Sequence, residues 1–503
     1  MIQFDTPMQA AGWLGDRVKG ELHCDSRMVK AGDGFIAWPG AAVDGRQFVR
    51  AALEQGASAC LVEREGVEAF SFDDVAVATY ASLKAATGPV ASIYYGEPTS
   101  ELAVLAITGT NGKTSTAWWL AQALSNLDPG IAVPCGLVGT LGVGRPPELH
   151  STGMTTPDPV LLQRQFRRFV EQGLQACAIE ASSIGLAERR LDGTRIRVAI
   201  FTNFTHDHLD YHGSMDVYWA AKAELFSWPG LESAVVNLDD PKGAEIVQAL
   251  APKGVQLWTF SIRDAARIQA RDVGYEGAGL RFTVVEGDSS YSLRTQLVGH
   301  YNVSNLLGVI GAMRAMGVEL ADAVRACGGL LPVPGRMDCL AMPGQPLVAV
   351  DYAHTPDALQ QALLALRPLA RERHGRLWCV FGCGGDRDAG KRPLMGAVAQ
   401  EHADRVVLTS DNPRSEDPRA ILRKILQGMT AGESVQVEED RAGAIALALG
   451  QAGADDVVLI AGKGHEDYQE IGGVRRPFSD KAHALNVLRG LDPSAPTFEG
   501  VTP

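Results

Sequence analysis

The stretch LAVLAITGTNGKTSTAWWLAQAL, residues 102–124, decides the fold of the central part of the chain. It opens with an apolar run of small and branched residues, 102–107, which predicts a buried strand. A short loop, 108–112, follows, and then Lys113, Thr114 and a helical pattern. This order of strand, loop and helix is the context of a phosphate-binding loop.

The residue types in this loop suit phosphate. Gly109 and Gly112 let the backbone approach phosphate oxygens, and the helix N-terminus adds unpaired N–H groups and a positive dipole end. Lys113 can reach terminal phosphates, and the Thr114 hydroxyl can ligate Mg²⁺. The generic pattern has a further Gly where this chain has Ile107, so the loop is a shorter form, G-x-x-G-K-T. A Gly-rich turn with a surface lysine is the alternative interpretation.

Bulk properties limit the class of protein. A chain of 503 residues predicts about three domains. A formal net charge of −13 argues against a general nucleic-acid or anionic-membrane surface. No apolar run approaches the length of a membrane span, and the first residues do not resemble a secretory signal. Eight cysteines without a C-x-x-C pair predict reduced thiols in a cytoplasmic protein, and we expect no zinc site.

The chain divides at two linkers rich in Gly, Pro or Ser, residues 94–100 and 331–336. We therefore expect domains at 1–98, 99–336 and 337–503. The first is a smaller α/β unit. In the other two, strands alternate with helices, which predicts α/β domains with a mainly parallel sheet and helices on both faces.

The expected strands of the two larger domains are short apolar runs. They lie at 102–107, 176–180, 197–202, 233–237, 346–351, 376–382, 404–409 and 456–461. Residues 255–297 instead show strand-like alternation, which predicts a small antiparallel insertion or edge sheet.

Two segments of the central domain carry polar residues after predicted strands. Glu180 ends the strand 176–180, where a carboxylate could hold the Mg²⁺ of a nucleotide, although a solvated helix-capping cluster is an equal alternative. Residues 206–212 contain three His and two Asp, a mixture that suits a divalent cation or phosphate and that we do not expect to pack in a core. Lys222 follows on a helix between alanines, and its own pattern predicts a solvated surface lysine.

Three loops of the last domain also follow apolar strands. They are 381–393, which is rich in Gly and basic residues, 410–418, which contains Arg414, and 461–468. Because the carboxyl ends of parallel strands meet at one edge of a sheet, we expect the three loops to lie together and to form a binding site.

The chain resembles the Mur ligase family of ATP-dependent amide-forming ligases over nearly its whole length. Within the family it is most similar to the members that add diaminopimelate. The motifs that carry the resemblance are DSR at 25–27, GTNGKTST at 109–116, TTPDP at 155–159, EASSIGL at 180–186, NFTHDHLDYHG at 203–213, GHYNVSN at 299–305, PGR at 334–336, DYAHTPDAL at 351–359, CGGDRDAGKRP at 383–393, DNPR at 411–414 and AGKGHE at 461–466.

The resemblance implies an N-terminal domain for the UDP end of a substrate, a central ATPase and a C-terminal Rossmann-like domain for an amino acid. The implied reaction adds meso-2,6-diaminopimelate to the D-Glu γ-carboxyl of UDP-MurNAc-L-Ala-D-Glu through an acyl phosphate, with ATP, in cytoplasmic peptidoglycan synthesis. The resemblance implies two Mg²⁺ ions and a carbamylated Lys222, which would turn a cation into a carboxylate. We expect a monomer without nucleic-acid partner or stable membrane insertion.

The resemblance also assigns site residues. For catalysis it implies Lys113, Glu180, His208 and Lys222. For metal it implies Thr114, Glu180, His208 and carbamylated Lys222. For ATP it implies Gly109, Thr110, Asn111, Gly112, Lys113, Thr114, Ser115, Asn305, Arg336 and Asp351. For the UDP-substrate it implies Ser26, Thr155, Thr156, Ser182, Glu188 and Arg190. For diaminopimelate it implies Arg387, Asp411, Asn412, Pro413, Arg414, Gly462 and Glu466.

The chain departs from the family pattern at two positions beside the expected sugar pocket. Glu188 stands where Gln is common, and Ile184 where His is common. A lysine-adding ligase, a ligase like folylpolyglutamate synthase and, from another class, a regulatory P-loop protein that binds ATP remain alternatives at this point.

Overall fold

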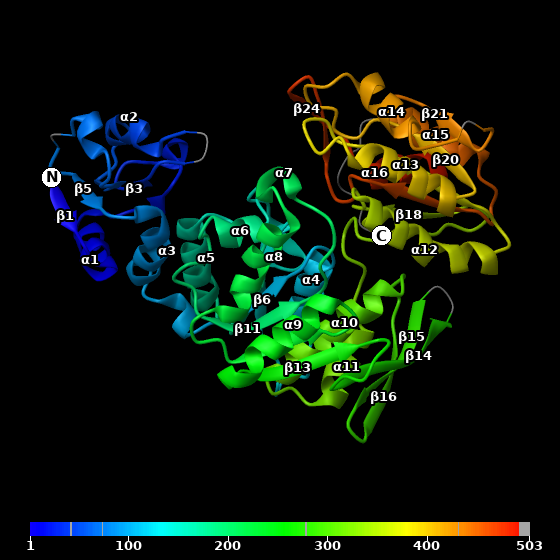
Figure 1. Cartoon of the computed structure of the whole chain (residues 1–503), viewed down its shortest axis with the longest axis horizontal. Helices are drawn as coiled ribbons and strands as arrows, with labels where there is room; N and C mark the ends of the chain where they lie inside the picture. Colours follow the sequence, from blue (N-terminus) through cyan, green and yellow to red (C-terminus); the bar gives the residue numbers. More distant parts are fainter. Residues whose placement is uncertain (41–42, 73, 277–278, 431, 492–503) are drawn as a thin grey trace.

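The structure is a computed structural model that describes residues 1–40, 43–72, 74–276, 279–430 and 432–491. Its centre is an eleven-stranded sheet that contains the phosphate-loop strand (Figure 1). In sheet order the strands are β16 (Ser289–Arg294), β15 (Gly279–Glu286), β14 (Ile268–Glu276), β13 (Gln256–Ser261), β12 (Ser233–Asn237), β11 (Ile196–Phe201), β6 (Ala103–Thr108), β10 (Ala176–Glu180), β7 (Cys135–Gly139), β8 (Gly142–Arg145) and β9 (Glu148–His150).

The inner strands from β14 to β7 are parallel, as the alternation of apolar runs predicts. Both edges are antiparallel ribbons, β14–β15–β16 and β7–β8–β9. The expected antiparallel insertion therefore exists, but its first strand does not belong to it, because β13 pairs in parallel with β12.

Helices cover both faces of this sheet, and each face has its own apolar core. The helices are α4 (Lys113–Ser125), α5 (Pro159–Glu171), α6 (Ser183–Ala187), α7 (Leu209–His212), α8 (Met215–Ala223), α9 (Pro241–Leu250), α10 (Tyr301–Ala315) and α11 (Leu320–Gly328). α4 and α10 are buried almost all round, which explains their lack of a polar face.

The N-terminal part contains a five-stranded parallel sheet. Its strands in order are β1 (Ile2–Phe4), β5 (Val77–Tyr80), β4 (Ala59–Glu63), β3 (Gly34–Ala37) and β2 (Leu22–His23), with helices α1 (Pro7–Arg17), α2 (Val49–Glu54) and α3 (Leu83–Tyr94). Two small apolar clusters stabilise it, one on each face.

The C-terminal part contains a six-stranded sheet. Its strands in order are β17 (Asp338–Leu340), β18 (Leu347–Asp351), β22 (Val457–Ala461), β19 (Leu377–Phe381), β20 (Arg405–Leu408) and β21 (Val435–Val437). Its helices are α12 (Pro356–Glu372), α13 (Lys391–His402), α14 (Pro418–Leu426), α15 (Arg441–Gln451) and α16 (Asp480–Leu488), and β23 (Tyr468–Ile471) and β24 (Val474–Pro477) form a separate hairpin. All pairs are parallel except β17–β18.

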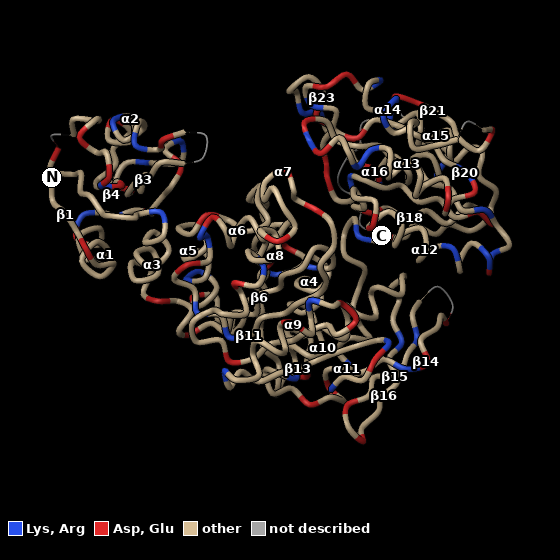
Figure 2. Tube along the Cα trace, in the orientation of Figure 1, with Lys and Arg blue, Asp and Glu red and all other residues tan. Residues whose placement is uncertain are grey.

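The α/β fold in three domains is therefore confirmed, while the boundaries 98/99 and 336/337 stay a prediction. Figure 2 shows acidic and basic residues interspersed along the trace. Within the described ranges, no helix combines the length and the apolar character that crossing a bilayer requires.

Candidate active site

The phosphate loop connects β6 to α4 in a conformation that requires glycine. Gly109 has a φ of +147° and Gly112 a φ of +84°. A Cβ at Gly109 would collide with the Thr202 side chain, and one at Gly112 would collide with Asn305. The loop therefore holds its backbone close to the end of the sheet, with the N-terminus of α4 directed at the space above it.

Lys113 begins α4 and folds back over the loop. Its Nζ donates to the carbonyl oxygens of Gly109 and Thr110, both at 2.8 Å. Burial lowers the pKa of Lys113, although the nearby carboxylates of Glu180 and Asp207 oppose this. Within the described residues Lys113 forms no ion pair with a carboxylate, so its charge is available to an anion.

Glu180 and Thr114 meet beside the loop. The Glu180 carboxylate is 1% exposed and accepts hydrogen bonds from Thr114 Oγ1 at 3.0 Å and from the Thr140 backbone N–H at 2.8 Å. A buried carboxylate beside a hydroxyl is an oxygen pair that suits Mg²⁺. The described chain contains no cluster of three His, Cys, Asp or Glu arranged to hold a metal.

Lys222 on α8 is buried, contrary to the surface lysine that its helix pattern predicts. It is 1% exposed, its Nζ donates to the Gly109 carbonyl at 2.7 Å, and the same atom lies 4.6 Å from the centre of the Tyr218 ring. Burial, together with the charge of Lys113, lowers the pKa of Lys222 well below its usual value. The neutral amine of such a lysine can act as a nucleophile.

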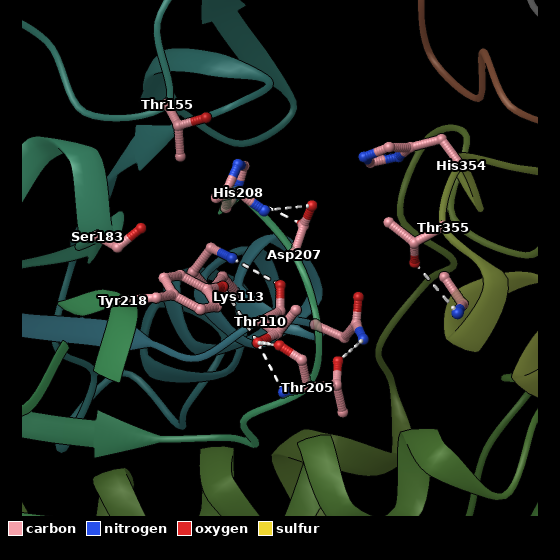
Figure 3. A network of polar contacts seen from close by, with 12 residues as sticks. Thr110, Lys113, Thr155, Ser183, Thr205, Asp207, His208, Tyr218, His354 and Thr355 are labelled. Carbon is pink, nitrogen blue, oxygen red and sulfur yellow. Dashed lines mark hydrogen bonds and ion pairs between the residues drawn. The ribbon is translucent and has the colours of Figure 1, made fainter. Parts of the chain in front are cut away.

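The segment 206–212 separates into one pair that faces the cavity and one residue that packs. Asp207 and His208 face the space beside Lys113 (Figure 3), and their side chains lie 3.4 Å apart. Burial would raise the pKa of Asp207, but His208 and other nearby positive groups hold it below its usual value. His212 is 7% exposed, its Nε2 lies 3.0 Å from Ser183 Oγ, and its ring contacts Tyr218. The expectation that none of these residues packs in a core was wrong for His212, because the short helix α7 directs it inward.

A cavity of about 830 Å³ lies between the carboxyl edge of the central sheet and the C-terminal domain. The predicted residues that line it are Thr110, Asn111, Gly112, Lys113, Thr114, Ser115, Thr155, Thr156, Glu180, Ser182, Arg190, His208, Lys222, Asn305, Arg336, Asp351 and Arg387. The structure thus brings together in one space residues that are more than 270 positions apart in the sequence, from Thr110 to Arg387.

The predicted substrate residues of the central domain form a connected network. The Thr156 hydroxyl donates to the Glu180 carbonyl at 2.7 Å and lies 2.9 Å from Ser182 Oγ. Arg190 Nη1 donates to the Thr156 carbonyl at 2.9 Å, and Thr155 Oγ1 lies 3.0 Å from Thr140 Oγ1. Hydroxyls and a guanidinium thus share the wall opposite Lys113.

Two predicted substrate residues do not line this cavity. Glu188 pairs with Lys84 at 2.7 Å and accepts from the Tyr211 hydroxyl at 2.5 Å, so it links the N-terminal and central domains. Ser26 begins a 3₁₀ turn in the N-terminal domain, two residues after Cys24, whose thiol contacts Asp158 at the start of α5. Their roles in binding stay predictions.

The predicted diaminopimelate residues lie where the three C-terminal loops meet. Because β22, β19 and β20 are neighbours in the sheet, the expected convergence of these loops is confirmed. Arg387 lines the cavity, whereas the remaining six are not among the residues that line it. These six are Asp411, Asn412, Pro413, Arg414, Gly462 and Glu466.

These six residues are held by one another and by the neighbouring loops. Asn412 Nδ2 donates to Glu466 Oε2 at 2.8 Å, and Lys463 Nζ donates to both side chains at 2.9 Å. Gly462 has a φ of +117°, and a Cβ there would collide with the Asp411 carboxylate. Arg414 has a φ of +52°, and its Nη1 donates to the Gly385 carbonyl at 2.6 Å.

The turn between β18 and α12 makes contacts that the sequence pattern does not predict. Asn111 Nδ2 of the phosphate loop donates to Asp357 Oδ2 at 3.0 Å, which joins the central and C-terminal domains. The Arg336 guanidinium lies 4.3 Å from the centre of the Tyr352 ring, and His354 faces the cavity (Figure 3). The motif DYAHTPDAL covers this turn, and of its residues the resemblance implies a role only for Asp351.

Comparison with known proteins identifies the architecture. Three family models match: "Mur ligase family, catalytic domain" over residues 21–90, "Mur ligase middle domain" over 107–313, and "Mur ligase, glutamate ligase domain" over 335–464. A protein of Acidovorax sp. (strain JS42), named UDP-N-acetylmuramoyl-L-alanyl-D-glutamate–2,6-diaminopimelate ligase, is 64% identical over 96% of this chain and 97% of its own. A protein of the same name from Janthinobacterium sp. (strain Marseille) is 48% identical over 95% of this chain and 96% of its own.

A solved structure of a protein with that name, 38% identical, superposes with a TM-score of 0.66 and covers 93% of this chain and 94% of its own. The chain therefore belongs to the Mur ligase family of ATP-dependent amide-forming ligases.

Proposed function

We propose that this enzyme adds meso-2,6-diaminopimelate to the D-Glu γ-carboxyl of UDP-MurNAc-L-Ala-D-Glu, with ATP as the energy source. The names of the relatives at 64% and 48% identity support this substrate pair. The observation that carries the proposal is the cavity, because it is lined both by the phosphate loop with Lys113 and by Arg387 of the C-terminal loops. A ligase that joins two substrates needs such a shared space.

The chemistry explains the charge of the cavity. A carboxylate is a poor acylating agent, so the D-Glu γ-carboxylate first attacks the γ-phosphorus of ATP, which gives an acyl phosphate and ADP. The amine then attacks the carbonyl carbon and releases phosphate. Both steps bring anions together, so the protein acts mainly by positioning and by neutralising negative charge. Lys113 would neutralise the transferred phosphoryl group, and Arg190 would hold the acceptor substrate.

Mg²⁺ fits the residues beside the loop. Thr114 and Glu180 would hold one ion, and Glu180, His208 and Lys222 would position a second; the ions would supply positive charge to the phosphate oxygens.

We further propose that Lys222 is carbamylated. Its burial and its lowered pKa support this, because a neutral amine can react with CO₂, and the resulting carboxylate suits a metal where an ammonium does not.

The other assignments complete the proposal. Asn305, Arg336 and Asp351 would contact adenine, phosphate and ribose. Arg414, Asn412 and Glu466 would bind the distal end of diaminopimelate. We propose domain boundaries near residues 98 and 336, a monomer, and a cytoplasmic site for the reaction.

The test is phosphate release with substrates omitted one at a time. We expect release only when ATP, UDP-MurNAc-L-Ala-D-Glu and meso-diaminopimelate are all present, with a product heavier than the acceptor by diaminopimelate less water. Release that needs no amino acid would indicate a regulatory ATPase and overturn the proposal. A preference for lysine in the same assay would assign the chain to the lysine-adding ligases.

A further inference from the structure

The C-terminal domain places one unengaged basic atom in the cavity. His354 lies in the turn between β18 and α12, and its Nδ1 lies 2.8 Å from the Tyr352 carbonyl oxygen. A carbonyl oxygen can only accept, so Nδ1 carries the hydrogen, and in the neutral ring Nε2 holds a lone pair. Within the described residues Nε2 has no hydrogen-bond partner.

The position of this ring is fixed by its neighbours on both sides. Thr355 caps α12 by accepting from the Ala358 N–H at 3.3 Å, and Asp357 binds Asn111 of the phosphate loop at 3.0 Å. The turn is thus anchored to the loop that would hold the phosphates. Figure 3 shows the His354 ring extending from the C-terminal domain across the cavity toward Asp207 and His208.

The other candidate proton acceptors on this side of the cavity are occupied. Asp351 accepts from the backbone N–H groups of Met337 at 2.7 Å and Ala353 at 2.8 Å, and Asp357 is bound to Asn111. Across the cavity, Glu180 is held by Thr114 and Thr140. His354 therefore offers a lone pair on the C-terminal side of the cavity, which Arg387 also lines.

We propose that His354 is the group that receives the proton of the attacking amine during amide formation. This rests on the proposed ligase function. The free amine attacks the acyl phosphate, and as the N–C bond forms its nitrogen becomes positive and donates a proton to Nε2. The C–O bond to phosphate then breaks, the electron pair leaves with the phosphate, and the imidazolium returns the proton to it, giving amide and hydrogen phosphate.

The surroundings of His354 keep its ring neutral before the reaction. Burial, and then Lys391, lower its pKa to about 4, so the ring is neutral at pH 7 and its lone pair is free. Asp207 and the hydrogen bond to Tyr352 oppose this shift, while Arg336 adds to it. Negative charge on the acyl phosphate would favour the imidazolium while it forms. A histidine that only packed against its neighbours would not need an Nε2 lone pair open to the cavity.

The test separates the two half-reactions in the full-length enzyme. His354→Asn keeps a donor for the Tyr352 carbonyl and removes Nε2. We expect ligation of meso-diaminopimelate to fall by about 10²-fold or more, the range for loss of a general base. Acyl-phosphate formation, measured by borohydride trapping without amino acid, should stay near the parent's rate.

A nucleophile that needs no base provides the second readout. Hydroxylamine is a much weaker base than an alkylamine, so its adduct loses the proton to water without a protein base, and its hydroxamate yield should be the same in His354→Asn and the parent. The matched control is His374→Asn, the same change at an exposed residue beyond the far end of α12, which should ligate normally.

Unchanged ligation in His354→Asn, or equal losses of ligation and acyl-phosphate formation, would overturn the role of His354. Failure of the parent to release phosphate in response to the amino acid would instead overturn the proposed function.

Discussion

The carboxyl edges of the central and C-terminal sheets hold their cations differently. At the central edge, the half-buried Lys113 and the buried Lys222 donate to backbone carbonyls of the phosphate loop. Within the described residues, neither lysine forms an ion pair with a carboxylate. Lys113 is therefore available to neutralise an anion, whereas Lys222, whose pKa burial lowers well below its usual value, would supply a carboxylate once carbamylated.

At the C-terminal edge three cations are already neutralised by carboxylates. Ion pairs join Arg392 to Glu416, Lys463 to Glu466 and Arg441 to Asp480, at 2.7, 2.9 and 2.7 Å. Arg387, Lys391 and Arg414 form no ion pair with a carboxylate within the described residues, and the Arg414 guanidinium donates to a carbonyl instead.

This difference in ion pairing agrees with the ligand that each sheet edge would bind. A transferred phosphoryl group carries several negative charges and needs uncompensated cations nearby. A zwitterionic amino acid needs charges of both signs in fixed places, which a paired network supplies. The predictions below test this division between a phosphate edge and an amino-acid edge.

The largest effect is expected at Lys113. Lys113→Ala should reduce ligation by at least about 10²- to 10³-fold, because the transferred phosphoryl group loses a preorganised charge. The circular dichroism spectrum should be unchanged, and Lys253→Ala, a change at an exposed lysine, should be active. Turnover near the parent's rate in Lys113→Ala would mean that the loop does not bind the phosphoryl group.

Lys222→Ala should be almost as inactive, but for another reason. If the side chain acts as a carbamate, the variant lacks a carboxylate, and a small acid such as acetate should restore part of the activity. Lys113→Ala should gain nothing from acetate. Mass spectrometry of the parent in bicarbonate would show 44 Da added at Lys222, and a lysine that stays unmodified and active would refute the idea.

Arg414→Ala should act on the amino acid alone. We expect the KM for meso-diaminopimelate to rise by about tenfold or more, since a hydrogen bond to a charged group contributes roughly 1.5–3 kcal/mol. The KM for ATP should hardly change, and Arg419→Ala, an exposed arginine nearby, is the control. Competition between lysine and meso-diaminopimelate gives the selectivity. Full preference for diaminopimelate in Arg414→Ala would show that Arg414 is not the selector.

The smallest effect is expected at His208. His208→Ala should lower kcat modestly and raise the Mg²⁺ concentration needed for half-maximal rate. His206 is exposed, and His206→Ala should behave like the parent. Because His212 packs against Ser183 and Tyr218, His212→Ala should lower the melting temperature more than the Mg²⁺ dependence. Equal shifts in Mg²⁺ requirement for all three would indicate a general anion site.

The sequence predicted the fold well where short-range patterns decide it. Two strands, β10 (Ala176–Glu180) and β12 (Ser233–Asn237), coincide with the predicted runs, because a fully buried parallel strand is apolar throughout. The convergence of the C-terminal loops could also be predicted, because the carboxyl ends of parallel strands meet at one edge of the sheet.

Contacts between distant segments could not be predicted in the same way. The burial of Lys222 depends on the phosphate loop 113 residues away, and the bond from Asn111 to Asp357 spans 246 residues. Glu188 was assigned to a sugar pocket, but its carboxylate pairs with Lys84 of the N-terminal domain. No local pattern encodes which domain a surface carboxylate will face.

The most direct test of the two-edge account is acyl-phosphate formation in the absence of any amino acid. Enzyme, ATP, Mg²⁺ and UDP-MurNAc-L-Ala-D-Glu are mixed, and the trapped γ-carboxyl product is counted in the parent, Lys113→Ala and Arg414→Ala. We predict that the parent and Arg414→Ala form it equally and that Lys113→Ala forms almost none. An Arg414→Ala enzyme as deficient as Lys113→Ala would contradict the division between the two edges.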